Sequence, residues 1–174
     1  MTTGLVHTEA LSVRAADDHV LLVERSWRED VDVHGAPAVV LCHGFVQNRR
    51  AFECPRRSLS AWLRDAGAVV WLPELRGRDG VRIAAGLHEY VDVDAPALLA
   101  AAHQRHHEVA WIGHSMGGLV GALTPEASSL ADAAGELAGE AAEDRAGWRV
   151  AAGDLDGDGR DDVIVGAPGW EDGS

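Results

Sequence analysis

The chain has 174 residues, of which 47% are hydrophobic and 25% charged, and its formal net charge is -13. This composition is typical of a folded chain with room for one domain of ordinary size, and it argues against disorder. The negative charge argues against nucleic acid as a partner, because phosphate contacts need clustered basic residues. The oligomeric state stays open.

The start of the sequence, MTTGLVHTEALSVRAADDH, lacks the basic region and apolar core of a secretory signal. No apolar run approaches the roughly 20 residues of a transmembrane helix. The sequence as given therefore predicts a cytoplasmic protein, whereas a start further upstream would allow an extracellular or periplasmic one.

Cysteine and histidine spacing gives no strong metal signal. Cys42 and Cys54 fit neither a disulfide framework nor the paired spacing of a metal site. His103 and His107 have the i, i+4 spacing of one helix face, but no acid joins them. This pattern favours a solvated helix end over a set of metal ligands.

Apolar runs alternate with amphipathic stretches from the N-terminus to about residue 123. Four runs predict strands and two stretches predict helices. The strands are Val20–Val23, Ala38–Cys42, Ala68–Leu72 and Val109–Ile112, and the helices are Leu59–Ala66 and Ala95–His103. This βαβ order predicts an α/β fold with a mainly parallel sheet and helices on both faces.

The character of the sequence changes near Thr124. From there to Ser174 it carries 13 acidic residues against three arginines, in a stretch rich in alanine and glycine. We therefore expect three parts: a domain over residues 1–123, a linker or leading edge over 124–145, and a separate segment over 146–174.

The segment Gly113-His114-Ser115-Met116-Gly117 passes directly from an apolar strand into a helix. A serine on such a sharp turn has strained backbone, so only small residues fit two positions before and after it. The helix that follows points its first N–H groups toward a site where negative charge develops. This pattern predicts a nucleophile elbow with Ser115 as the nucleophile.

A second motif, His43-Gly44-Phe45, follows the strand Ala38–Cys42. A His-Gly pair there lets the next residue turn its backbone N–H into the site. We expect the N–H groups of Phe45 and Met116 to form an oxyanion hole. His43 precedes the nucleophile on the opposite loop, so we expect it to be structural rather than the catalytic base.

On these motifs, residues 36–123 resemble the first half of an α/β-hydrolase, close to esterase- and lipase-like members. The resemblance implies a partial α/β-hydrolase sheet, a small ester or lipid-like substrate and no cofactor for this half. The residues it implies as support for the elbow and the oxyanion loop are His43, Gly44, Gly113, His114, Gly117 and Gly118.

A third loop resembles the family only in part. Pro73–Gly77 is similar to the family's D-x-R-G-x-G loop, with Glu74 at the acidic position. Arg78–Gly80 then departs from that pattern. Further along, VDVDAP resembles the start of the helix before the nucleophile strand, with Asp94 as its expected cap.

The family places the acid and base of its triad after the serine, in the order Ser, Asp or Glu, His. No histidine follows Ser115, and none of the earlier candidates has the family's position; these are His88, His103, His106 and His107. Without a base the serine hydroxyl stays protonated and is a poor nucleophile. We therefore expect no substantial esterase activity from this chain alone, unless another subunit donates a base.

The strands that normally follow the nucleophile strand are also missing from the resemblance. We therefore expect Val109–Ile112 to be an exposed edge strand with a bare apolar face. Such an edge is an aggregation hazard.

The C-terminal segment places carboxylates at alternate positions, in Asp154, Asp156, Asp158 and Asp162. With the carbonyl oxygen of Arg160, such a loop can wrap a hard cation, and calcium accepts roughly six to eight oxygens in flexible geometry. An EF-hand is disfavoured, because Val165 stands where the bidentate Glu would be and a β-type run follows.

Residues 146–169, AGWRVAAGDLDGDGRDDVIVGAPG, resemble an FG-GAP repeat, the blade unit of integrin-α-like β-propellers. Gly166-Ala167-Pro168 matches the GAP and Gly147 the glycine of FG, but Ala146 replaces its phenylalanine. The resemblance implies that the four aspartates named above are calcium ligands and that a short β segment forms one blade. A solvated acidic turn is the alternative. One blade cannot bury its own faces, since repeat folds generally need about three units.

Three interpretations follow for the whole chain. It is a serine hydrolase by descent that is catalytically incomplete, a calcium-binding structural or adhesion module, or a fused or truncated gene product with neither activity. The sequence favours the fused or truncated gene product as a physical description, and hydrolase ancestry as the functional assignment.

Overall fold

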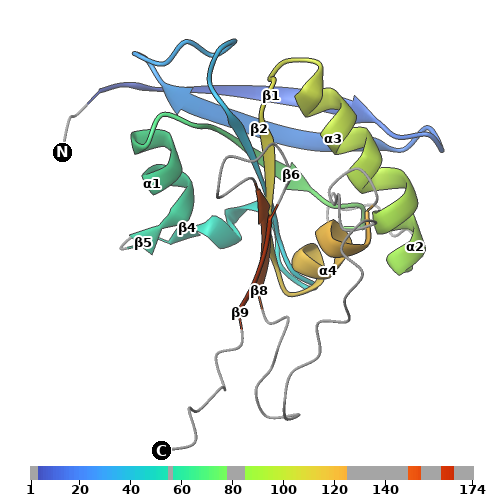
Figure 1. The fold of residues 1–174 in the computed structure, drawn as a ribbon. Helices are drawn as coiled ribbons and strands as arrows, with labels where there is room; N and C mark the ends of the chain where they lie inside the picture. The colour runs from blue at the N-terminus through green and yellow to red at the C-terminus, as the bar shows by residue number, and fades with distance from the viewer. Residues whose placement is uncertain (1–3, 55–56, 78–84, 125–148, 154–161, 167–174) are drawn as a thin grey trace, which may run out of the picture.

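The computed structural model describes residues 4–54, 57–77, 85–124, 149–153 and 162–166. Seven strands form one sheet in the order β1-β2-β6-β3-β7-β8-β9 (Figure 1). In that order they span Val6–Arg14, Val20–Arg28, Val69–Glu74, Ala38–Cys42, Val109–His114, Arg149–Gly153 and Asp162–Gly166. A separate two-stranded sheet pairs β4 (Glu53–Cys54) with β5 (Arg57–Ser58).

The sheet is mixed rather than mainly parallel. β6, β3 and β7 run parallel to one another, whereas β1 and β2 on one side and β8 and β9 on the other are antiparallel to their neighbours. The prediction of a mainly parallel sheet is therefore right for the centre and wrong for β2, whereas β8 and β9 were not expected in this sheet. The flanking strands come in hairpins, which pair antiparallel, while helical crossovers join the central strands.

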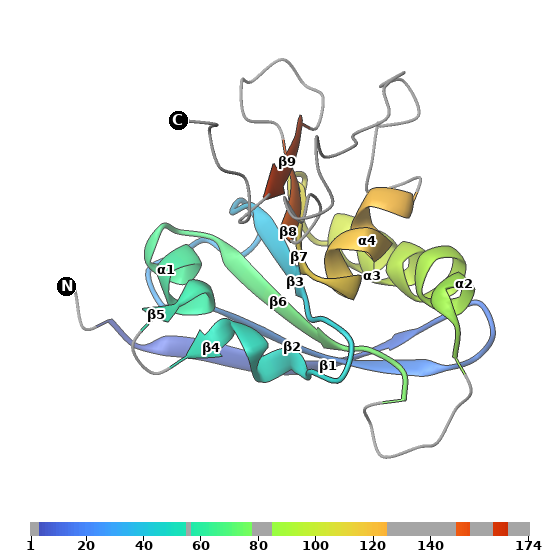
Figure 2. The same cartoon turned by 90° about the horizontal axis from the view of Figure 1, so that it is seen from below.

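Helices cover both faces of the sheet, as predicted. The 3₁₀-helix η1 (Arg49–Phe52) and α1 (Leu59–Asp65) lie on one face (Figure 2). The opposite face carries α2 (Leu87–Glu89), the π-helical turn η2 (Tyr90–Asp94), α3 (Ala95–His103) and α4 (Met116–Leu123). No helix in the described ranges is long and apolar enough to span a membrane.

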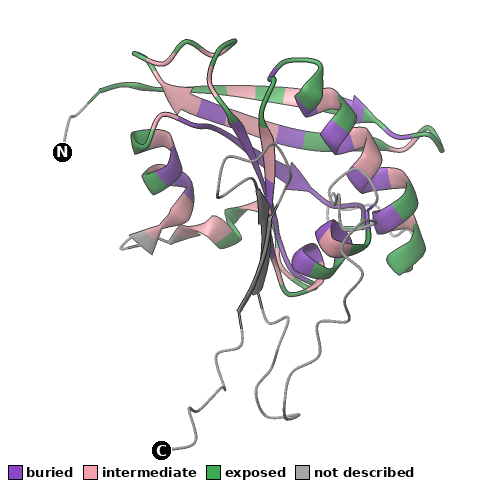
Figure 3. Ribbon diagram, viewed as in Figure 1, coloured by how far each residue is buried: buried purple, intermediate pink, exposed green. Residues whose placement is uncertain are grey.

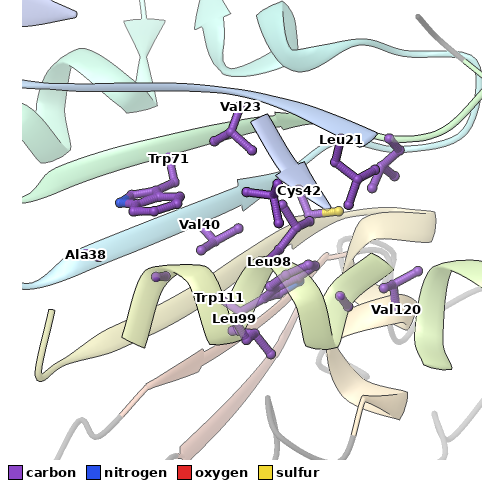
Figure 4. Close-up of a cluster of buried hydrophobic side chains, with 14 of the residues drawn as sticks. Leu21, Val23, Ala38, Val40, Cys42, Trp71, Leu98, Leu99, Trp111 and Val120 are labelled. Carbon is purple, nitrogen blue, oxygen red and sulfur yellow. The ribbon is translucent and has the colours of Figure 1, made fainter. Parts of the chain in front are cut away.

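The alternation of side chains along the central strands divides the core into two clusters. β3 is buried at every position. Figure 3 shows buried residues on central strands of the sheet and on parts of the helices beside them. Its side chains Ala38, Val40 and Cys42 pack with α3 and α4, and Figure 4 shows Trp71 and Trp111 in this cluster. The intervening β3 side chains pack toward α1 in the second cluster. Burial on both faces explains why β3 is apolar throughout.

The edge of β7 is covered, so the expectation of an exposed edge strand is wrong. β8 pairs antiparallel with β7 from Trp111 opposite Ala152 to His114 opposite Arg149, and β9 then pairs with β8. The β8–β9 hairpin thus provides hydrogen-bond partners for β7, in place of the hydrolase strands that are missing from the resemblance. The likeness of this hairpin to a propeller blade stays a prediction.

Candidate active site

The two predicted motifs meet at the carboxyl ends of the central strands. β3 and β7 are parallel neighbours, and Cys42 at the end of β3 is level with Gly113 on β7. The loops that leave them, which begin with His43 and with Ser115, therefore emerge side by side. Open α/β sheets bind their ligands outside the carboxyl ends of the strands.

Ser115 lies at the turn from β7 to α4, and it is exposed. Its φ of 53° and ψ of -120° belong to a region that non-glycine residues rarely adopt. The carbonyl oxygen of Ser115 accepts hydrogen bonds from the N–H groups of Gly118 (3.0 Å) and Leu119 (3.1 Å), which start the helix. A strained serine between a strand and a helix has the geometry of a nucleophile elbow.

Two glycines permit this turn because backbone segments approach each other closely. A Cβ on Gly113 would lie 2.2 Å from the backbone of Gly117 and of Gly118, and a Cβ on Gly117 would lie 2.2 Å from the carbonyl oxygen of Cys42. In each case the obstructing atom is backbone, which cannot move aside as a flexible side chain can. The glycine spacing of the motif therefore reflects contact between β7, α4 and β3.

Two backbone N–H groups near Ser115 and on the loop after β3 are candidates for the predicted oxyanion hole. Met116 is the first residue of α4, so its N–H has no carbonyl four residues earlier in the helix. In the described part of the chain, no hydrogen bond engages the N–H of Met116 or of Phe45. The positive end of the helix dipole favours negative charge at the same place.

Residues 44–47, here called the oxyanion turn, carry Phe45. The N–H of Gln47 donates to the carbonyl oxygen of Gly44 over 3.2 Å, which closes the turn. Val46 adopts a φ of 64°, a left-handed conformation that β-branched residues rarely take. Both apolar side chains at its tip are exposed, Phe45 by 68% and Val46 by 69%.

His43 is held by backbone on both ring nitrogens. Its Nε2 accepts the N–H of Leu75 at 3.2 Å, so Nδ1 carries the proton and donates to the carbonyl oxygen of Gly44 at 2.9 Å. The Glu74 carboxylate lies 3.3 Å from Nε2. His43 thus joins the oxyanion turn to the loop after β6, and this geometry does not direct it at Ser115.

A buried ionic network fixes the loop after β6. The Arg76 guanidinium donates through Nε to both carboxylate oxygens of Asp94 (3.0 and 2.8 Å) and through Nη1 to Asp17 (2.6 Å). These bonds raise the pKa of Arg76, and Arg76 lowers the pKa of Asp17 to about 2. The expectation that Asp94 caps α3 is wrong, because its buried carboxylate makes no cap hydrogen bond and pairs with Arg76 instead.

The four histidines considered as catalytic bases lie away from the nucleophile or are engaged elsewhere. His103 and His107 are exposed near the start of β7, whereas Ser115 follows its end. His106 is buried there and lies 3.0 Å through Nδ1 from the carbonyl oxygen of Ala36. His88 pairs with Asp92 on the surface. Among the described residues, none of the four histidines considered as bases forms a hydrogen bond with Ser115.

Most of the predicted calcium loop lies outside the described residues. This holds for Asp154, Asp156, Asp158 and Arg160, as it does for Arg78–Gly80 of the third loop. Asp162 begins β9 and is opposite Gly153 at the end of β8. Within the described ranges, no group of three or more His, Cys, Asp or Glu side chains could hold a metal ion.

Sequence reasoning missed two features of this site. One is the Gln47 side chain, which bridges the oxyanion turn and the elbow through Gly44 and His114. The other is the pairing of Arg76 with Asp94. Charge complementarity between the motif PELRG and the acidic VDVDAP was the available signal, but periodicity does not report such pairings.

Comparison with protein families matches residues 37–128 to the family model described as alpha/beta hydrolase fold, and residues 146–174 to the FG-GAP repeat. The first match covers more than half of the chain. The chain therefore belongs to the alpha/beta hydrolase family, and it carries an FG-GAP repeat at its C-terminal end. A search of curated proteins finds no match.

Solved structures agree on the fold. An epoxide hydrolase from an endophytic Streptomyces is 18% identical, with a TM-score of 0.50 over 66% of this chain and 32% of its own. A prolyl endopeptidase is 23% identical, with a TM-score of 0.53 over 73% of this chain and 21% of its own. The S-formylglutathione hydrolase of Staphylococcus aureus is 17% identical, with a TM-score of 0.50 over 68% and 52%. The chain thus spans between about a fifth and about a half of each of these proteins.

Proposed function

We propose that this chain carries an acyl-transfer site in which Ser115 is the nucleophile for an ester or related acyl substrate. The observation that carries the proposal is the strained backbone of Ser115 at a strand-to-helix turn, held by the close approach of Gly113 and Gly117. The N–H groups of Phe45 and Met116 would bind the oxygen that becomes negative when the serine oxygen attacks a carbonyl carbon.

The attack also requires that the serine proton be removed, and we propose that this part of the site is incomplete. Attack forms the bond from Ser115 Oγ to carbon, and collapse of the tetrahedral intermediate expels the alcohol, which takes up a proton. A general base normally carries the proton and later activates water. No histidine follows Ser115 in the sequence. An activated ester should therefore acylate Ser115 slowly, and the acyl group should be hydrolysed slowly.

Intact-mass measurement after exposure to p-nitrophenyl acetate tests this proposal. We expect one acetyl group per chain, located on Ser115, with little catalytic turnover of p-nitrophenolate. Ser115→Ala should remove the adduct, and Ser12→Ala, at an exposed position on β1, should keep it. An adduct that persists in Ser115→Ala would overturn the assignment of the nucleophile.

Added imidazole tests the missing base. Imidazole in solution should speed turnover by the wild-type protein more than by Ser115→Ala, because it supplies the base that the chain lacks. The difference between the two proteins removes the direct reaction of imidazole with the ester. Rapid turnover without imidazole that disappears in Ser115→Ala would contradict catalytic incompleteness.

The FG-GAP match supports calcium binding as a second candidate function. The proposed ligands are hard oxygen donors, namely the carboxylates of Asp154, Asp156, Asp158 and Asp162 and the carbonyl of Arg160, which suit calcium. The two ends of this segment are held together, since Gly153 and Asp162 are paired. Isothermal titration should show heat at millimolar calcium that is lost in Asp156→Ala. Absence of both this heat and the acyl adduct would favour a gene product with neither activity.

A further inference from the structure

The Gln47 side chain joins the two halves of the proposed oxyanion hole. Its Oε1 lies 2.9 Å from the backbone nitrogen of Gly44 and 2.9 Å from Nδ1 of His114. Gly44 begins the oxyanion turn, and His114 is the residue before the nucleophile. One amide oxygen therefore connects the loop that carries Phe45 to the elbow that carries Ser115.

The donors fix the chemistry of this contact. A backbone N–H can only donate, so the oxygen of the Gln47 amide must face Gly44. The same oxygen then accepts from His114, so His114 must carry its proton on Nδ1 when it is neutral. When His114 is neutral, neither contact involves a charged group. Together with the bond from Gln47 N–H to the Gly44 carbonyl, the two contacts close the turn from both sides.

The packing leaves little room for another arrangement. A Cβ on Gly44 would lie 3.0 Å from each of three atoms: Oε1 of Gln47, Nδ1 of His114 and the His114 carbonyl oxygen. At the same time Val46 has a left-handed φ of 64° that its β-branched side chain disfavours. Nearby structure must hold such a residue in place. Gln47, which follows it directly, makes the hydrogen bonds that do so.

We infer that Gln47 is a positioning residue, which holds the strained oxyanion turn against the elbow so that the N–H groups of Phe45 and Met116 converge on one oxygen. This inference rests on the proposed acyl-transfer function of Ser115. Gln47 does not itself touch the substrate. It acts on the step in which negative charge develops, because a displaced donor weakens stabilisation of the oxyanion.

The kinetic test is the rate of Ser115 acylation by p-nitrophenyl acetate, measured over a range of ester concentrations. Gln47→Leu removes the acceptor and keeps much of the volume. We expect the limiting acylation rate to fall by about 10- to 100-fold, less than the roughly 10²–10³-fold loss when an oxyanion donor is removed outright. The apparent affinity for the ester should not change. Gln104→Leu, at an exposed position beyond α3, is the matched control and should react as wild type.

A second variant separates positioning from loss of structure. Glycine at position 46 adopts a left-handed turn without strain, so the turn would depend less on Gln47. We expect Val46→Gly combined with Gln47→Leu to recover part of the rate that Gln47→Leu loses. A double variant as slow as Gln47→Leu, or a Gln47→Leu variant as fast as wild type, would overturn the inference.

Two measurements without substrate complete the test. Amide hydrogen exchange should show that Gly44 is protected in the wild type and exchanges faster in Gln47→Leu, and nitrogen-15 NMR should find the His114 proton on Nδ1. An unprotected Gly44 would refute the contact whatever the kinetics show. If the wild type is not acylated on Ser115, the proposed function fails, whereas equal acylation of wild type and Gln47→Leu would reject only the role of Gln47.

Discussion

The two ends of the parallel strands β6, β3 and β7 differ in how their loops are held. At the carboxyl end, Val46 and Ser115 have positive φ values of 64° and 53°. At the amino end, neighbouring segments are joined by backbone hydrogen bonds. The N–H of Ala38 donates to the carbonyl oxygen of Glu108, and the N–H of Val69 donates to that of Pro37, both at 2.9 Å. Strain in the described residues is thus concentrated at the end that carries the candidate site.

This difference indicates which loops serve chemistry and which serve stability. Strained backbone persists only where several surrounding contacts hold it in place, and it clusters at functional sites. At the carboxyl end, glycine contacts, the Gln47 bonds and a buried ion pair provide that support. The amino end has relaxed backbone and needs none of these devices. Substitutions at the two ends should therefore act in different ways.

The largest effect is expected from Gly117→Ala. The added methyl carbon would lie 2.2 Å from the carbonyl oxygen of Cys42 and 2.7 Å from that of His43, so α4 could not keep its place against β3. We expect a loss of about 4–5 kcal/mol in the free energy of unfolding, or no folded protein, which is at the extreme of single substitutions. Chemical denaturation measures the loss.

Gly86→Ala is the matched control, because among the described residues its methyl group would meet only Glu89 Oε2, at an ordinary 3.4 Å. Equal stability of the Gly117→Ala and Gly86→Ala proteins would contradict the view that the elbow depends on backbone contact. It would also remove the physical reason for the glycine spacing around Ser115.

Arg76→Met should produce the next largest effect. The change removes the partner of Asp94, which is fully buried, and leaves an uncompensated charge. Breaking a buried pair from one side costs about 3–5 kcal/mol, whereas replacing both partners costs less. Urea unfolding should therefore show that Arg76→Met combined with Asp94→Leu is more stable than Arg76→Met alone.

Arg14→Met serves as a control on the surface, where its ion pair with Asp18 is exposed. We expect a change of about 0–1 kcal/mol there. A double variant less stable than Arg76→Met would mean that the network does not depend on charge balance.

Val46→Gly should have a smaller effect and the opposite sign. A left-handed conformation costs a non-glycine residue about 1–2 kcal/mol, and the greater freedom of glycine in the unfolded chain offsets roughly 0.5–1 kcal/mol of the gain. We expect the free energy of unfolding to rise by about 0.5–1 kcal/mol, as measured by thermal unfolding. Asp18, with a φ of 68°, is the control. Aspartate tolerates this region, so Asp18→Gly should gain less. A loss of stability in Val46→Gly would show that the turn is not strained.

Much of the central fold was predictable because it depends on local patterns. The strand Ala38–Cys42 and the helix Ala95–His103 have the bounds predicted from their apolar runs. The elbow was predictable for the same reason, since its glycine spacing is imposed by contacts within a few residues and with one neighbouring strand. The membership of the alpha/beta hydrolase family is likewise confirmed.

Features that depend on distant pairing were not predictable. The strand Val6–Arg14 is partly polar and mostly exposed, so it lacks a clear hydrophobic signal. Pairing of β8 with β7 joins segments separated by a long connection and follows from no local pattern. The Arg76 network and the Gln47 bridge also link residues far apart in sequence. These are the contacts that decide how the site is supported.

The smallest effect, and the one that concerns the amino end, is the pH dependence of His106. This side chain is 2% exposed, packs edge-on against Trp71 and lies 3.0 Å from the Ala36 carbonyl oxygen, to which neutral Nδ1–H donates. Burial lowers the pKa of His106 below its usual 6.5. The unfolded chain therefore takes up the proton first as the pH falls, so the contribution of His106 to stability is complete above about pH 6.5 and declines below it.

The variant His106→Gln keeps an N–H donor and cannot titrate. Its urea midpoint should therefore vary less between about pH 7.5 and about pH 5.5, a range above most carboxylate titrations. His107→Gln, at an exposed neighbour, should retain the wild-type slope. If His106→Gln also retains it, the amino end does not hold a neutral histidine in its core, and the contrast between a relaxed end and a strained end would rest on the backbone angles alone.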